Sequence, residues 1–285
     1  MDRNPTESVW PAFVVVFAAM VVSIGAQIVI AVGLTLRHMS GGGGSDPDAI
    51  RQATEGFFMS PVGIIVMGGI AQIAFIGSVL IAIRFLPGSR TEQLGLQRPG
   101  LPWSSYVTFA VGTGVPVGVG IGLSMLLSLA FEPMVDPAQI WVKITLWTFL
   151  PYVLFISLAP GFIEEITFRG FVQRRILRRF GPPVAIACSS VLFAVAHIDP
   201  HAILFTLPIG VWLGVIAWRV GAVWPCIVCH AVLNGVWSIY FIAAVKNDAT
   251  TGFYSASAVV LGAISVVGFV ASVRILARTG RQEGS

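Results

Sequence analysis

The sequence predicts an all-α, polytopic integral membrane protein with about eight transmembrane helices. Of its 285 residues, 56% are hydrophobic and only 11% are charged, whereas a soluble domain has about 25% charged residues. The mean hydropathy is +0.87. The apolar residues also gather in runs of about the 20 residues that cross a ~30 Å hydrocarbon core. We therefore expect a multi-pass protein of the cell membrane, in contact with the lipid bilayer.

Eight apolar runs account for this prediction. They lie near residues 10–36, 57–83, 103–131, 140–160, 183–198, 201–218, 222–245 and 253–273. The fifth and sixth runs are short and are joined by the sequence HIDPHA. The first run is too long for a signal peptide and has no small-residue cleavage site, so we interpret it as a retained helix.

Lysine and arginine are distributed unevenly between the two sides of these runs. With the N-terminus inside, twelve basic residues face the cytoplasm, four face the opposite side, and Arg169 lies within the membrane. The cytoplasmic set is Arg3, Arg84, Arg90, Arg98, Arg174, Arg175, Arg178, Arg179, Arg219, Arg274, Arg278 and Arg281; the opposite set is Arg37, Arg51, Lys143 and Lys246. This positive-inside bias predicts that both termini are cytoplasmic. It also explains the net charge of +4, so we expect no nucleic-acid partner.

The chain divides into three regions. Residues 1–135 hold the first three helices and a glycine-rich outer loop at 40–48, which we interpret as flexible and without chemistry. Residues 136–250 hold the fourth to seventh helices, and residues 251–285 hold the last helix and a short basic cytoplasmic tail. In the third run Gly114, Gly118 and Gly122 recur every four residues, which predicts a smooth face for close helix contact.

Three charged residues are embedded in apolar sequence: Glu164, Glu165 and Arg169. A charge at the bilayer centre costs at least ~2.5 kcal/mol, so embedded charges are usually paired or functional. Glu165 and Arg169 are spaced i, i+4 and should pair on one helix face. Glu164 lies about 100° round the helix. It is either a glutamate near the headgroups or a general base facing a wet cavity.

Two further motifs place histidines on apolar runs. Phe193 and His197 are spaced i, i+4 near the end of the fifth run, and His230 and Asn234 have the same spacing in the seventh. A lone histidine is more often structural than functional. Two histidines, a glutamate and an asparagine on three separate helices, however, form a set that helix bundles project inward as a metal or catalytic site. His201 is a weaker candidate, as an accessory ligand beyond the helix-breaking Pro200.

This set suits the hydrolysis of an amide. A carboxylate beside an apolar wall can take a proton from water. Imidazoles can hold a divalent metal, and an asparagine amide can donate to the developing oxyanion. The sequence contains no H-E-x-x-H, G-x-S-x-G or phosphate-binding glycine loop.

The order Glu164-Glu165-x-x-x-Arg169, Phe193-x-x-x-His197, His230-x-x-x-Asn234 resembles the CPBP intramembrane metalloproteases, also called the CAAX prenyl protease or Abi family. Residues 136–250 would be its homology domain. The resemblance implies an intramembrane metalloendopeptidase in which Glu164 activates water and His197, His230 and Asn234 complete the catalytic site. It implies that Glu165, Arg169 and Phe193 support that site.

The same resemblance implies a divalent metal, zinc, held by Glu164, His197 and His230. An oxyanion hole made by the histidines beside Glu164, without a metal, is the other mechanism compatible with it. The substrate would be a peptide or protein cleaved within the membrane, lipidated or not.

Two other functions are compatible with the motifs. A non-catalytic immunity or scaffold protein could use the same cavity to bind a partner. A proton or ion transporter could use buried glutamate and histidine as a relay, although the sequence shows no internal repeat.

Straight helices would not bring these residues to one depth in the membrane. Counted at about 1.5 Å per residue from the cytoplasmic loops, Glu164 and His230 lie about 15 Å and 13 Å deep and His197 about 22 Å. We expect either a fifth helix that is tilted or begins outside the membrane, or a fourth helix broken at Pro160-Gly161. The arginines at 174–179 would then lie along an amphipathic cytoplasmic stretch that touches anionic lipid.

The sequence Cys226-x-x-Cys229-His230 matches a haem-attachment pattern. Charge topology places it at the cytoplasmic end of an apolar helix, whereas haem attachment occurs on the other side of the membrane. We therefore expect no haem and interpret the cysteines as small packing residues.

Overall fold

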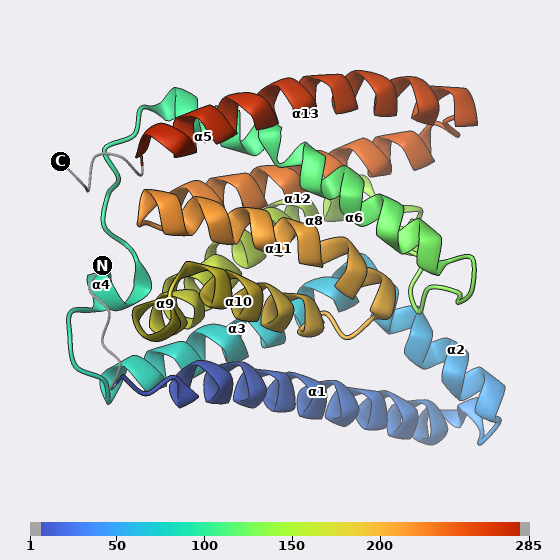
Figure 1. The fold of residues 1–285 in the computed structure, drawn as a ribbon. Coiled ribbons are helices and arrows are strands. Elements are labelled where there is room, and N and C mark those ends of the chain that lie inside the picture. The colour runs from blue at the N-terminus through green and yellow to red at the C-terminus, as the bar shows by residue number, and fades with distance from the viewer. Residues whose placement is uncertain (1–6, 280–285) are drawn as a thin grey trace.

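A computed structural model describes residues 7–279, and every regular element in that range is a helix (Figure 1). The elements are α1 (Trp10–His38), η1 (Met39–Gly43), α2 (Pro47–Phe58), α3 (Pro61–Arg84), α4 (Arg90–Leu94), α5 (Trp103–Gly112), α6 (Gly114–Leu127), α7 (Ala138–Trp141), α8 (Leu146–Glu164), η2 (Glu165–Gln173), α9 (Arg174–Phe180), α10 (Pro182–Val195), α11 (Pro200–Val220), α12 (Trp224–Lys246) and α13 (Thr251–Thr279). The all-α prediction is confirmed.

Seven helical stretches among the described residues are long and apolar enough to cross a membrane. They are α1 with η1, α3, α5 with α6, α8 with η2 and α9, α11, α12 and α13. The predicted fifth span is shorter: α10 has 14 residues, or about 21 Å of helix. The protein is thus a multi-pass membrane protein with seven candidate spans and one short apolar helix.

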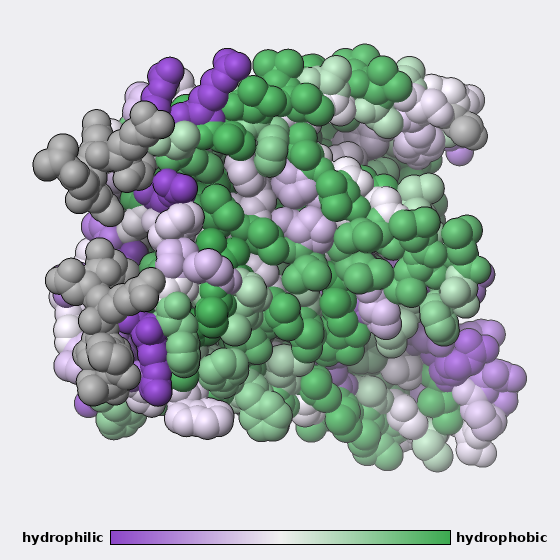
Figure 2. Space-filling view, in the orientation of Figure 1, coloured by the Kyte–Doolittle hydropathy of each residue, from purple (hydrophilic) through white to green (hydrophobic). Residues whose placement is uncertain are grey.

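The outer surface of the bundle agrees with a lipid environment. Figure 2 shows apolar residues covering most of the visible face between polar ends. Large apolar side chains such as Phe17 and Trp147 are 71% and 86% exposed. Exposed apolar surface of this extent is unfavourable in water and marks a contact with membrane.

The longest helical stretch passes through the centre of the bundle. Helix α8 packs between α3 and α12, α1 packs on α3, and α13 packs on α5 and α6 at the opposite edge (Figure 1). Helix α10 packs against η2 and α9 on one side and α11 on the other. These contacts bring the predicted functional helices together in the interior.

Residues 146–180 form one uninterrupted helical stretch, although Pro151 and Pro160 lie within α8. A break at Pro160-Gly161 is therefore wrong. The irregularity comes later, at Glu165, where the backbone changes to π-helical hydrogen bonding over nine residues. Wide turns of this kind are rare and often occur at functional sites.

A tight turn at Gly181 resolves the mismatch in depth between Glu164 and His197. Gly181 has φ +84°, which favours glycine, and Pro182 starts α10 directly after it. Because the helix of Glu164 extends to Phe180, the arginines at 174–179 belong to that helix. Counted along the two helices from Gly181, Glu164 and His197 lie about 25 Å and about 24 Å away. Both residues can then occupy one level.

The described ends of the chain lie at the same end of the bundle. The start of α1 and the end of α13 both lie at the left in Figure 1. That both termini are cytoplasmic stays a prediction. Arg3, Arg281 and the tail at 280–285 lie outside the described residues.

Two expectations about glycines are corrected. A Cβ at Gly114 would collide with Ser265 of α13, but Gly118 and Gly122 have nothing within 4 Å, so the predicted stripe is not a contact face. The close approach to α11 is made by Gly120 instead, against the backbone of Phe205. In the outer loop 40–48, the helical backbone is interrupted at Gly42, where φ is +89°, and α2 begins at Pro47.

Candidate active site

The candidate site residues come from four helical segments of the bundle. Glu164, Glu165 and Arg169 lie at the junction of α8 and η2. Phe193 lies on α10, and His197 follows two residues after its end. His230 and Asn234 lie on α12, and Gln72 of α3 joins them.

Glycine at position 161 brings α8 and α12 close together beside this junction. A Cβ on Gly161 would lie 3.0 Å from the Cβ and backbone nitrogen of Ala231, which is tighter than ordinary contact. Ala231 directly follows His230. The close approach therefore places the imidazole of α12 within reach of the carboxylates of α8 and η2.

Glu165 is the centre of a fully buried ionic cluster. Its Oε1 accepts hydrogen bonds from Nη1 of Arg169 at 2.9 Å and lies 2.8 Å from Nδ1 of His230. The side chains of Glu165 and Arg169 are both 0% exposed. The ion pair expected from the i, i+4 spacing is thus present, and His230 is its third member.

Phe193 contacts this cluster from α10. The guanidinium carbon of Arg169 lies 4.3 Å from the centre of the Phe193 ring, and Nη2 of Arg169 donates to the carbonyl of Gly210 at 3.2 Å. The rings of His197 and His230 meet the Phe193 ring nearly edge to face, with centroids 5.0 Å and 6.0 Å away. Phe193 thereby contacts both imidazoles and covers the arginine.

The surroundings of the two histidines favour one tautomer for both. Nδ1 of His197 lies 2.9 Å from the carbonyl of Phe193, and Nδ1 of His230 faces the carboxylate of Glu165. Because a carbonyl and a carboxylate only accept, Nδ1 must carry the hydrogen in each ring. In the neutral form of each ring, Nε2 then carries the lone pair.

Glu164 and Asn234 are less buried than the ionic cluster. Oε1 of Glu164 accepts a hydrogen bond from Nε2 of Gln72 at 2.7 Å. Nδ2 of Asn234 donates to the carbonyl of Ile156 at 3.0 Å. An amide nitrogen carries two hydrogens, so Asn234 keeps one N–H for another acceptor.

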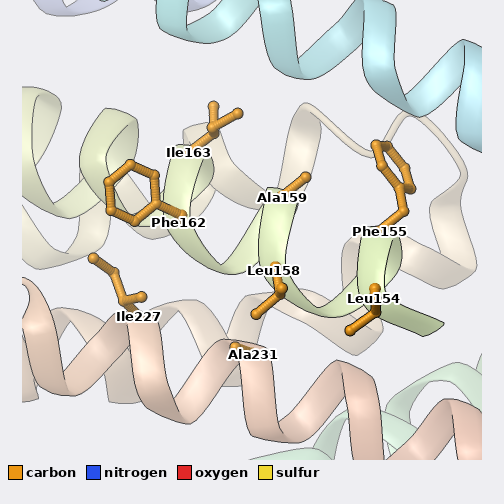
Figure 3. A pocket seen from close by; sticks show the side chains of 8 residues that line it. All are labelled: Leu154, Phe155, Leu158, Ala159, Phe162, Ile163, Ile227 and Ala231. Carbon is orange, nitrogen blue, oxygen red and sulfur yellow. The ribbon is translucent and has the colours of Figure 1, made fainter. Parts of the chain in front are cut away.

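A groove of about 660 Å³ runs along the lipid-facing side of the same helices (Figure 3). It is lined by Leu154, Phe155, Leu158, Ala159, Phe162 and Ile163 of α8 and by Ile227 and Ala231 of α12. Its lining residues are all apolar. Ile163 precedes Glu164 and Ala231 follows His230, so lining residues and site residues share the same turns of α8 and α12.

The predicted zinc ligands are not gathered into a metal centre. Within residues 7–279, no three His, Cys, Asp or Glu side chains form a group that could hold a metal ion. The Nε2 atoms of His197 and His230 are suitable donors, but as these residues lie they do not fit a three-ligand zinc site. The metal assignment stays a prediction, and we derive no step through a metal.

Several predicted residues are therefore in direct contact and others are not. Glu165, Arg169, Phe193 and His230 form one cluster, and His197 joins it through Phe193. His201 is buried, and neither ring nitrogen has a hydrogen-bond partner in the described part of the chain. The cysteines pack in the interior, where Sγ of Cys226 donates to the carbonyl of Leu213.

Sequence reasoning did not identify Gln72. Its signal was available, since it is the only strongly polar side chain between Pro61 and Ile83. Asn234 is identified through its i, i+4 spacing from His230, whereas Gln72 has no such partner on its own helix. Its partner is 92 positions away, so no local spacing rule connects the two.

Comparison with known proteins adds one match. A family model described as type II CAAX prenyl endopeptidase Rce1-like matches residues 146–236, about a third of the chain. The match begins at α8 and ends within α12, so it contains all the residues of the site except Gln72. No curated protein and no solved structure shows a significant match.

Proposed function

Because residues 146–236 form a domain of the Rce1-like family of type II CAAX prenyl endopeptidases, we propose that the protein is an intramembrane endopeptidase in which Glu164 activates water. The family is one of proteases. The observation that carries the proposal is the buried Glu165–Arg169–His230 cluster directly beside Glu164. Such charges are costly inside a membrane and are retained there mainly for function.

In this proposal Glu164 is the general base. Gln72 holds Oε1 of the carboxylate, which leaves Oε2 to take a proton from water. The water oxygen attacks the peptide carbonyl carbon. Glu164 then passes the proton to the departing amide nitrogen, so that the C–N bond breaks and a carboxylic acid and an amine leave.

The remaining residues stabilise and orient. The free N–H of Asn234 donates to the oxygen that becomes negative during attack. His230 is held in one orientation by Glu165, which Arg169 fixes in turn. His197 is held by the carbonyl of Phe193. Their Nε2 atoms accept hydrogen bonds from water or from the substrate.

The groove supports a hydrophobic substrate that enters from the membrane. Its apolar lining can receive apolar side chains or a lipid chain. The bound group loses van der Waals contact with bilayer lipid and gains contact with the side chains that line the groove. We propose that the substrate is a peptide or protein cleaved at a site within the cell membrane, lipidated or not.

One experiment separates the candidate functions. Purified wild type and Glu164→Gln are assayed with a farnesylated fluorogenic CAAX peptide and with an unmodified hydrophobic peptide, and metal content is measured in both preparations. Cleavage that requires Glu164 supports the protease. A groove that binds peptide without cleaving it would favour the scaffold or immunity protein. Activity that follows the zinc content would identify the metal-dependent mechanism.

A further inference from the structure

A single amide interrupts the apolar sequence of α3. Gln72 is 6% exposed, and its neighbours in the sequence are Ala71 and Ile73. Burying an amide costs about 1–3 kcal/mol in protein mutational data when its hydrogen bonds are not replaced. A buried amide in a membrane helix therefore needs an explanation.

Half of that explanation is the hydrogen bond to Glu164. Nε2 of Gln72 lies 2.7 Å from Oε1 of the carboxylate. A carboxylate accepts only, so the nitrogen of the amide must be the atom that faces it. The contact fixes the carboxylate from a helix outside the matched family domain.

The other half of the amide has no partner. Oε1 of Gln72 is buried and accepts no hydrogen bond from any residue in the range 7–279. It is bonded to the same carbon as Nε2, the atom that donates to the carboxylate of Glu164. A water molecule that gives one hydrogen to Glu164 can give its second hydrogen to this oxygen.

We propose that Gln72 is a positioning residue for the hydrolytic reaction, an inference that rests on the proposed function. Its N–H holds one oxygen of Glu164, and its Oε1 receives the second hydrogen of the attacking water. The general base and the nucleophile are thereby oriented together, before the substrate arrives.

Gln173 provides a matched control. It is a buried amide too, but both of its ends are satisfied: Nε2 donates to the carbonyl of Gly214 at 2.7 Å, and Oε1 accepts from Ser189 at 3.0 Å. Gln173 is thus a structural amide, whereas Gln72 is half satisfied and next to the general base.

The test compares Gln72→Met, Gln173→Met, Glu164→Gln and the wild type on the farnesylated and unmodified fluorogenic peptides. For Gln72→Met we expect kcat to fall about 10- to 100-fold, as for other residues that orient a reactive group, while KM changes less than about twofold. Gln173→Met should lower the thermal midpoint and leave kcat within about threefold. In a Glu164→Gln background, Gln72→Met should have no further effect on the residual rate.

Three results would overturn this inference alone: full kcat in Gln72→Met, a change confined to KM, or an equal loss in the Glu164→Gln background. If Gln72→Met does not fold, Gln72→Asn is used instead. It keeps the amide but shortens the side chain by one methylene, which moves the amide away from Glu164, and the same loss of kcat is expected. A wild type that cleaves neither peptide, or a Glu164→Gln variant with full activity, overturns the proposed function and this inference with it.

Discussion

Nδ1 of His230 lies 2.8 Å from the Glu165 oxygen that also accepts the hydrogen bond of Arg169. One carboxylate oxygen thus joins helix α12 to η2 across 65 positions of sequence. The arrangement couples the orientation of a candidate active-site imidazole to a buried ion pair. Its contribution to the free energy of unfolding is measurable.

Removing one partner of the buried ion pair should be strongly destabilising. We expect Glu165→Leu to lower the free energy of unfolding by about 3–5 kcal/mol, because the Arg169 charge stays buried without its counterion. Unfolding by denaturant in detergent micelles measures this loss. The double variant Glu165→Leu/Arg169→Met should recover most of it. A double variant as unstable as the sum of the single changes would contradict the pairing.

Phe193 should matter for stability and for activity. Phe193→Ala removes the ring that covers Arg169 and contacts both histidines, and we expect a loss of about 3–5 kcal/mol. Phe193→Leu should lose less stability and still lose activity, because it fills space without holding the guanidinium. Phe180→Leu, at the exposed end of α9, serves as control. Equal activity in both leucine variants would refute this role.

Filling the groove should impair substrate binding. Ala159→Phe places a ring inside the apolar groove, so KM for the peptide should rise about tenfold, equivalent to about 1.4 kcal/mol, with little change in kcat. Val191→Phe, on a lipid-exposed position of α10 outside the groove, should leave both constants unchanged. Kinetics of the two variants decide whether the groove receives substrate.

The residues before α1 are held by arginines of α9. Nε and Nη2 of Arg178 each donate to the carboxylate of Glu7 at 2.6 Å, and Nε of Arg175 donates to the carbonyl of Ser8 at 2.8 Å. These contacts occupy arginines that the sequence assigned to anionic lipid. We expect Glu7→Gln to cost about 1.5–3 kcal/mol, as charged hydrogen bonds do.

The contribution of Glu7 should weaken with added salt, since the contact is only partly buried. The thermal midpoint of the wild type should therefore approach that of Glu7→Gln as sodium chloride is raised. Asp48→Asn, which breaks an exposed pair with Arg51, should change stability very little. A Glu7→Gln variant with wild-type stability at low salt would contradict the contact.

Local sequence rules predicted much of the site. Spacing placed Glu165 against Arg169, and composition predicted a multi-pass helical protein. The rules failed where geometry depends on distant segments. The helix of Glu164 extends to Phe180 and the chain turns at Gly181, so Glu164 and His197 can occupy one level. A count that treats the arginines at 174–179 as a loop cannot anticipate this. Gln72 reaches Glu164 only through the packing of α3 on α8.

The most direct test of the account is the rate of peptide cleavage by purified Glu164→Gln beside the wild type. The substitution keeps the size of the side chain, but it replaces one acceptor oxygen with an NH2 group that only donates. The resulting amide cannot accept a proton from water. We predict that the wild type cleaves at least one of the two peptides and that Glu164→Gln lowers kcat at least about 10²-fold, the lower range of a general-base contribution. Cleavage by Glu164→Gln at the wild-type rate would contradict the central claim.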